Sequence, residues 1–406
     1  MEPLFFPHNP SFWFETLRSF GHIAYGGADF GEVVVTTQRI TAGDYDSWHD
    51  EWLATADRVA DEGRTALAGG HRVSARDAFL RASNYYRSAE FFLHGDATDP
   101  RILHAYDASV RCFRQAAALF TPVIEPVEIP YEDTVLPGYL YRADDSGTAR
   151  PTVVMFNGFD GTAEEMHFGG AAAAVERGYN VLSFDGPGQP GTRHHHGLVF
   201  RPDWENAVGP VLDYALTRPE VDPARIALLG NSMGGPARAT RRGLRAPPRR
   251  RHRPRRRLRS GRHGHRLPAL DRAEAERRLR ADRDPELDAA VEAAMAASPK
   301  IRWLVDQGMY VMGADTPRGL FATFLDYHLR DGIAQKITCP TLVCSAPDDV
   351  FFEGQPELLH EHLTCPKTLL EFTAVLGADA HCQAGAQRLA FARVYDWLDD
   401  VMAESA

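Results

Sequence analysis

Lysine and cysteine are scarce in this sequence, and it contains no long hydrophobic run. The five cysteines are scattered and show no CxxC spacing, which argues against a structural zinc site and favours reduced thiols in the cytosol. No apolar stretch approaches the length of a membrane span, and the first residues lack the basic and apolar regions of a signal peptide. We therefore expect a cytoplasmic protein that does not span a membrane.

Lysine is replaced almost entirely by arginine, and the arginines are unevenly spread. The chain has three lysines and 42 arginines among its 406 residues, which indicates a GC-rich coding sequence. Residues 238–283 hold 19 arginines and four acids, so the rest of the chain has 26 basic and 51 acidic residues. One short segment therefore masks a strongly acidic protein, and it needs a separate explanation.

The length of the chain allows one large α/β domain and an accessory domain. Apolar residues recur at helical spacing over 48–60, 78–92 and 102–119, which predicts a helical N-terminal domain with aromatic residues in its core. These helices share no sequence repeat, so a helical-repeat protein is disfavoured. We expect four regions, namely helices over 1–120, a first core part over 121–235, an anomalous arginine-rich segment plus cap helices over 236–336, and a second core part over 337–406.

Short apolar runs alternate with helical patterns after residue 122. Two strands, over 123–131 and 136–141, are expected to pair with each other. Further strands are expected over 151–156, 179–184, 225–229, 341–344 and 368–372. Strands that alternate with helices predict a mostly parallel sheet with right-handed crossovers.

The sequence Gly230-Asn231-Ser232-Met233-Gly234-Gly235 directly follows the apolar run at 226–229. A Gly-x-Ser-x-Gly turn between a buried strand and a helix lifts a serine hydroxyl to the sheet edge at a strained backbone position. Small flanking residues avoid collisions of a Cβ with the neighbouring strand or helix. We interpret Ser232 as a nucleophile, and the alternative is an ordinary glycine-rich turn.

A serine nucleophile needs a base to take its proton and an acid to orient that base. In this architecture the order along the chain is serine, acid, histidine, with the last two on loops after late strands. His381 follows the strand at 368–372, and its alternative role is that of a surface loop residue. Asp349 is preferred over Asp348 as the acid because it lies further past the strand at 341–344, although either could simply be a turn residue.

The tetrahedral intermediate of acyl transfer needs hydrogen-bond donors for its oxyanion. One donor is expected to be the backbone N–H of Met233, directly after the nucleophile. The second is expected to be the backbone N–H of Phe159, in the loop after the strand at 151–156. Gly158 and Gly161 would let that loop approach the nucleophile closely.

Three consecutive histidines, His194 to His196, could indicate a metal site. Consecutive side chains point in different directions, and no carboxylate spacing accompanies them. We interpret them as a solvated loop and expect no metal and no cofactor.

The arginine-rich segment lacks the strand that an α/β core requires after its nucleophile. Residues 236–301 contain no aromatic residue, and no apolar run over 236–283 could form a buried strand. Our hypothesis is a frameshift in GC-rich DNA, with the original frame restored near 268–285; a genuine tract would be a disordered insertion. Nucleic-acid binding is the rival function, but aromatic residues that could stack on bases are missing and the remaining chain is acidic.

Together, the sequences at 157–161, 185–188 and 230–235, with Asp349 and the loop at 377–381, resemble the α/β-hydrolase superfamily. More narrowly, the chain resembles FrsA-like esterases and the 2,6-dihydropseudooxynicotine hydrolase group, in which helices precede the hydrolase core. The stretches at 201–205 and 219–223 also fit that group. The resemblance implies an α/β-hydrolase fold with a helical N-terminal domain and a cap, in which only 236–283 is anomalous.

This resemblance implies a serine hydrolase that cleaves an ester or related acyl bond of a small apolar substrate. Members of the group also cleave carbon–carbon bonds beside a ketone, including in polyketide-like compounds, and the same triad can serve both reactions. An inactive homologue, damaged by the frameshifted segment, is the other alternative. Relatives of this kind are often dimers, so a homodimer is also implied.

Overall fold

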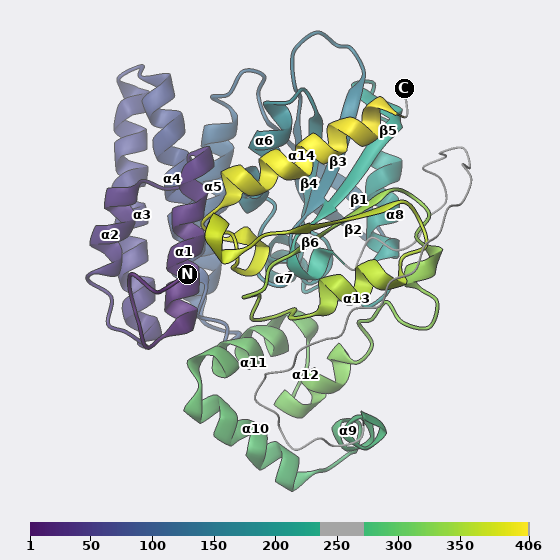
Figure 1. Ribbon diagram of the computed structural model, residues 1–406. Helices are drawn as coiled ribbons and strands as arrows, with labels where there is room; N and C mark the ends of the chain where they lie inside the picture. The colour runs from purple at the N-terminus through teal and green to yellow at the C-terminus, as the bar shows by residue number, and fades with distance from the viewer. Residues whose placement is uncertain (236–271, 405–406) are drawn as a thin grey trace.

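A computed structural model describes residues 1–235 and 272–404, and its N-terminal part is entirely helical (Figure 1). Its helices are α1 (Pro10–His22), α2 (Phe30–Thr37), α3 (Tyr45–Ala68), α4 (Arg72–Glu90) and α5 (Pro100–Ala117). Asp44 and Asp99 cap α3 and α5 by accepting hydrogen bonds from backbone N–H groups of the first turn. Trp48, Trp52 and Phe79 are fully buried, so the aromatic residues form the core, as predicted.

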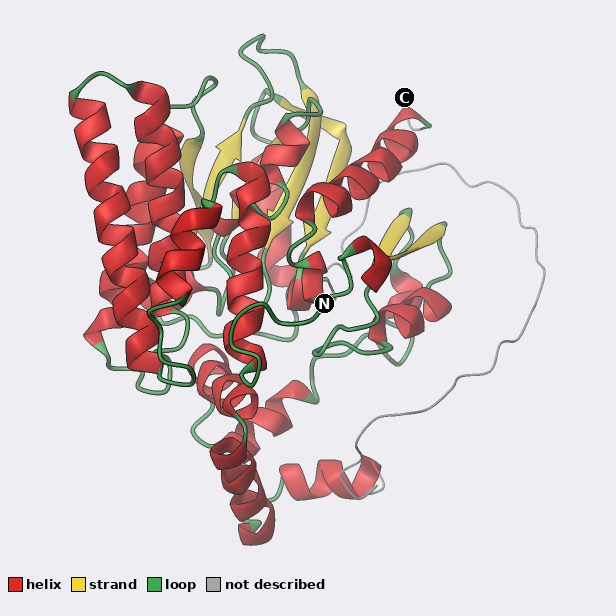
Figure 2. Cartoon of the chain, turned by 60° about the vertical axis from the view of Figure 1, so that its left-hand side comes forward, coloured by secondary structure: helices red, strands yellow, loops and turns green. Residues whose placement is uncertain are grey.

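A five-stranded mixed sheet lies beside these helices (Figure 2). Its strands are β1 (Glu125–Tyr131), β2 (Thr134–Tyr141), β3 (Arg150–Phe156), β4 (Asn180–Phe184) and β5 (Val221–Gly230). The spatial order is β1-β2-β4-β3-β5. β2 is antiparallel to both of its neighbours, β1 and β4, whereas β3 is parallel to both of its neighbours, β4 and β5. β4 is buried along its whole length, and its apolar residues are Val181, Leu182 and Phe184.

Helices cover the sheet and the carboxyl ends of its strands. The helices around the strands are α6 (Ala171–Val175), α7 (Pro190–His196), α8 (Glu205–Ala215), α13 (Gln355–His362) and α14 (Gln387–Ala403). A separate group below the strand ends in Figure 1 consists of α9 (Arg272–Leu279), α10 (Pro285–Ala297), α11 (Pro299–Met312) and α12 (Pro317–Phe324). Among the described residues, no helix has the length and apolar character needed to cross a membrane.

The last two strands, β6 (Thr341–Ser345) and β7 (Lys367–Glu371), pair in parallel as a separate sheet (Figure 2). Within the described residues no strand pairs with the outer edge of β5 or of β6. A cavity of about 2930 Å³ lies between them, lined by β5, β6 and α14 and reaching Ser232 and His381. The predicted loss of a core strand concerns residues 236–283; of these, 236–271 lie outside the described part of the chain, and Arg272–Leu279 form α9.

Candidate active site

Ser232 lies in the turn directly after β5, where its backbone has a φ of +54°. A non-glycine residue rarely adopts this left-handed conformation, and here it directs the side chain away from the strand. A Cβ on Gly230 would collide with the backbone of Gly234, so the tight turn requires glycine. The local sequence therefore builds the strained turn that was predicted around the serine.

Two loops from the second sheet bring an imidazole and a carboxylate to this serine. His381 Nε2 lies 2.9 Å from Ser232 Oγ, and His381 Nδ1 lies 2.9 Å from Asp349 Oδ2. The side chains of His381 and Asp349 are 9% and 11% exposed, which shields their ion pair from water. These distances allow the imidazole to accept the serine proton while the carboxylate fixes its tautomer.

Asp349, rather than Asp348, contacts the imidazole. Its second oxygen, Oδ1, accepts hydrogen bonds from the backbone N–H groups of Phe351 and Phe352 at 2.9 and 3.0 Å. Burial would raise the pKa of Asp349, but His381 and these N–H groups outweigh burial and lower it. The Asp348 side chain is 66% exposed and points elsewhere. Of the two aspartates that the sequence left open, only Asp349 is placed to orient the histidine.

The environment of His381 favours its protonated form. Burial disfavours the charge, but the Cys382 sulfur and the Asp349 carboxylate outweigh burial and raise the pKa of the imidazole above its usual value of 6.5. Cys382 Sγ lies 3.4 Å from His381 Nε2. A cation that forms on the imidazole during proton transfer would therefore be stabilised.

Met233 directly follows Ser232 in the nucleophile turn, and the loop that carries Phe159 packs against this turn. A Cβ on Gly158 would lie 2.6 Å from Ser232 Cβ and 2.9 Å from Met233 N, so the two segments are in direct contact. Neither the backbone N–H of Phe159 nor that of Met233 donates to another group in the part of the chain that the structure describes. Both groups are thus available for an oxyanion near Ser232 Oγ.

Aromatic rings surround the imidazole. The ring centroids of Phe351, Phe352 and Phe14 lie 4.9, 5.6 and 6.1 Å from that of His381. Phe14 comes from α1, so the N-terminal helices contribute directly to the surroundings of the site. The surface beside the imidazole is therefore largely aromatic.

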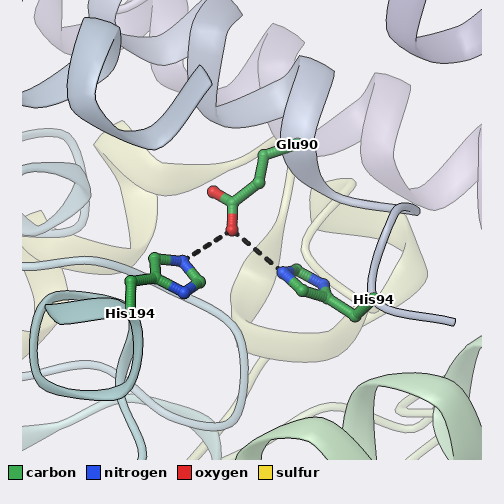
Figure 3. A group of neighbouring side chains, drawn as sticks. All are labelled: Glu90, His94 and His194. Atoms are coloured by element: carbon green, nitrogen blue, oxygen red, sulfur yellow. Dashed lines mark hydrogen bonds and ion pairs between the residues drawn. The ribbon is translucent and has the colours of Figure 1, made fainter. Parts of the chain in front are cut away.

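One cluster away from Ser232 has the residue types of a metal site, namely Glu90, His94 and His194 (Figure 3). Both histidine Nε2 atoms approach the same oxygen of Glu90, at 2.9 Å from His94 and 2.8 Å from His194. Two N–H donors on one carboxylate oxygen form a hydrogen-bonded clamp, and Tyr310 completes it through a 2.6 Å contact with His194 Nδ1. The clamp joins α4, α7 and α11.

The prediction that His194 to His196 form a solvated loop was wrong in two respects. They belong to helix α7, and the side chain of His194 is only 1% exposed. His195 and His196 are exposed, as predicted. The error arises because the partners of His194 lie far away in the sequence, where no local pattern could indicate them.

Sequence reasoning missed several residues that hold the loop carrying Phe159. Gln307 Nε2 on α11 donates to the Phe159 carbonyl at 3.0 Å, and Gln189 Nε2 contacts the carbonyls of Asn157 and Gly158. Arg18 on α1 lies close to the same loop. Their residue types are common on protein surfaces, so nothing in the sequence distinguished them.

The chain is similar in sequence to a known protein family and to known hydrolases. The chain matches the family described as "Esterase FrsA-like" over residues 10–251. It is 34% identical over 425 residues to a 20-hydroxy-prefusarin hydrolase of Gibberella moniliformis, covering 97% of this chain and 96% of that protein. It is also 34% identical over 416 residues to the hydrolase acrC of Aspergillus aculeatus, covering 96% of each chain.

A solved structure supports the same assignment at the level of the fold. The crystal structure of a 2,6-dihydroxy-pseudo-oxynicotine hydrolase superposes with a TM-score of 0.65 at 20% identity, covering 94% of this chain and 95% of that one. This structural similarity confirms the α/β-hydrolase fold, and the near full-length relatives confirm that the protein is a hydrolase. The chain therefore belongs to the FrsA-like family of α/β hydrolases.

Proposed function

We propose that this hydrolase cleaves an ester or related acyl bond of a small apolar substrate through an acyl-enzyme on Ser232. The observation that carries the proposal is the pair of 2.9 Å contacts that link Ser232, His381 and Asp349 in series. Serine alone is a weak nucleophile, and such a relay is the arrangement that activates it.

In the first step, His381 Nε2 takes the proton of Ser232 as Oγ attacks the substrate carbonyl carbon. The carbonyl oxygen becomes an oxyanion that accepts hydrogen bonds from the N–H groups of Phe159 and Met233. The imidazolium then gives its proton to the leaving alkoxide, which departs and leaves an acyl-serine. In the second step His381 deprotonates water, which attacks the acyl carbon; the imidazolium then returns this proton to Ser232 Oγ as the acyl–oxygen bond breaks and the acid leaves.

The surroundings of the site support an apolar substrate. The aromatic rings of Phe14, Phe351 and Phe352 around His381 offer contact area to an apolar molecule and no partner for a multiply charged one.

We also propose that the enzyme is cytoplasmic, because its five cysteines form no disulfide.

A fluorophosphonate probe tests the nucleophile, because it reacts covalently with activated serines. We expect the wild-type protein to be labelled on Ser232 and Ser232→Ala to remain unlabelled. Asn231→Ala is a neighbouring control that keeps the hydroxyl. An unlabelled but folded wild-type protein would refute the serine mechanism and favour an inactive homologue.

Product analysis separates the two bond types that the sequence left open. We expect p-nitrophenyl esters of medium-length apolar acids to be turned over faster than β-diketones. Faster cleavage of the β-diketones would replace the ester assignment by carbon–carbon bond hydrolysis with the same residues.

A further inference from the structure

The loop that carries Phe159 is held in place by groups from outside the hydrolase core. Its backbone contacts the nucleophile turn at Gly158, where a Cβ would come within 2.6 Å of Ser232 Cβ. A shift of the loop would therefore move the Phe159 N–H relative to Ser232 Oγ. Displacements of about 1 Å in such a site can cost roughly a hundredfold in rate.

The orientation of the Phe159 N–H is set through the carbonyl of the same peptide group. The Gly158 carbonyl contacts Gln189 Nε2 at 3.3 Å, and in a planar trans peptide the C=O and N–H point in opposite directions. The Gly158 N–H is occupied by Asn157 Oδ1 at 2.9 Å. Asn157 therefore determines how the chain enters the turn that presents Phe159.

Asn157 is in turn linked to helix α1 by two charged side chains. Asn157 Nδ2 donates to Glu165 Oε2 at 3.0 Å. Arg18 on α1 donates to both oxygens of Glu165, with 2.6 Å from Nε to Oε1 and 2.6 Å from Nη2 to Oε2. Its Nη1 lies 3.1 Å from Asp160, the residue directly after Phe159. Arg18 thus contacts the loop directly at Asp160 and is linked through Glu165 to Asn157 on the other side of Phe159.

This network lies out of water, so its charges act strongly on one another. The side chains of Arg18 and Glu165 are only 11% and 4% exposed. Burial would raise the pKa of Glu165, but Arg18 and Arg87 outweigh burial and lower it to about 2. Loss of Arg18 would take the bidentate partner from the buried Glu165 and the ion-pair partner from Asp160, whose side chain is 21% exposed, and would thereby release the loop from α1.

We propose that Arg18 is a positioning residue of the reaction, and that helix α1 sets the oxyanion site through Glu165, Asn157 and Asp160. The inference rests on the proposed function. It gives the N-terminal helices a part in stabilising the transition state, beyond their contribution to the apolar surroundings. Figure 1 shows α1 on the side of the helical bundle that faces the rest of the molecule.

The test compares Arg18→Met with Arg18→Lys and with Glu165→Gln, which keeps the shape of the side chain. We expect kcat and the rate of fluorophosphonate labelling to fall about tenfold to a hundredfold in Arg18→Met, while KM stays unchanged. Arg18→Lys should recover part of the rate, because the charge returns without the bidentate geometry. Inhibition by phenylboronic acid, whose tetrahedral adduct uses the same N–H donors, should weaken in parallel.

Arg81→Met is the matched control, because Arg81 pairs with Glu32 in the same helical region and does not contact the loop. It should keep the wild-type kcat. Circular dichroism and thermal unfolding establish that each variant is folded. If Arg18→Met does not fold, kcat and the labelling rates of Arg18→Lys and Glu165→Gln test the inference in its place. Wild-type kcat and labelling rates in the folded variants would overturn the inference, whereas an unlabelled wild-type protein would instead refute the proposed function.

Discussion

Asp349 and His381 are 32 residues apart in the sequence, yet their side chains meet at 2.9 Å between Oδ2 and Nδ1. Each comes from the loop that follows one strand of the β6–β7 pair, so the parallel pairing of these strands brings the two loops together. The acid is also fixed from its other side by two backbone N–H groups. Its orientation is therefore determined before any substrate binds.

Asp349→Asn should lower kcat by roughly ten-thousandfold, because the amide favours the wrong tautomer of His381. Asp348→Asn is the matched control, since its side chain is 66% exposed and lies away from the imidazole. Hydrolysis of a p-nitrophenyl ester measures both. Equal losses in the two variants would contradict the assignment of the acid.

Activity should rise with pH through a pKa above 6.5. The imidazole acts as a base only when deprotonated, and its folded-state pKa is raised by Cys382 and Asp349 against the effect of burial. The same raised pKa stabilises the fold at low pH, and this contribution is lost as the pH rises through the folded-state value. The pH dependence of kcat/KM measures this rise, which we call the rising limb of the profile.

Variants of the two neighbours separate their effects on this limb. Cys382→Ala and Asp349→Asn should both move it to lower pH, because each removes a group that favours the cation. A wild-type limb at or below 6.5 would show that burial dominates instead.

Gly158→Ala should reduce the labelling rate of Ser232 by about tenfold to a hundredfold, because the new Cβ would push the loop away from the nucleophile turn. Gly31→Ala is the control, since a Cβ added at Gly31 would have its nearest neighbour, Asp29 Oδ1, at 3.4 Å, an ordinary contact. A Gly158→Ala protein as active as Gly31→Ala would show that the loop tolerates displacement.

Glu90→Gln should lower the free energy of unfolding by about 1 to 3 kcal/mol, because a buried acceptor of two histidine N–H groups loses its charge. Asp107→Asn changes a similar pair, with His195 on the same helix, but both partners are largely exposed. Its effect should stay below about 1 kcal/mol. Urea unfolding followed by circular dichroism compares them, and equal effects would argue against the clamp.

The gene should show compensating insertions or deletions around the codons for 236–283. The edges of β5 and β6 that pair with no strand among the described residues line one cavity, which a parallel strand between them would divide. Arginine codons of the CGN type, when read one base later, begin with G and encode Val, Ala, Gly, Asp or Glu. His252 before Arg253 then becomes Ile or Thr, so the shifted frame permits the apolar run that a buried strand needs.

Sequencing the transcript tests the frame directly, and an uninterrupted frame without insertions or deletions would refute it. A frame-restored gene provides a second measurement. Its product should unfold at a higher temperature than the protein encoded by the present sequence, because an added strand buries apolar surface of β5 and β6. No change in the unfolding temperature would argue against a missing strand.

Much of the fold followed from local pattern. The largely apolar runs at 151–156 and 179–184 predicted β3 and β4, because strands buried on both faces are rich in apolar residues. The serine turn was equally visible, since its glycines meet a steric need within a few residues. The antiparallel pairing of β2 with β4 could not be predicted from local pattern, because the alternation of strands with helices does not indicate where the strands before it pair.

The sequence by itself determined the strands, the strained turn at Ser232 and the order of serine, acid and histidine along the chain. Tertiary structure alone decided that Asp349 and not Asp348 meets His381, that His194 is buried against Glu90, and that Arg18 contacts Glu165. The reason is the range of the interactions. A turn or strand depends on neighbours within a few residues, whereas Arg18 and Glu165 are 147 positions apart and meet only after the helices have packed on the sheet.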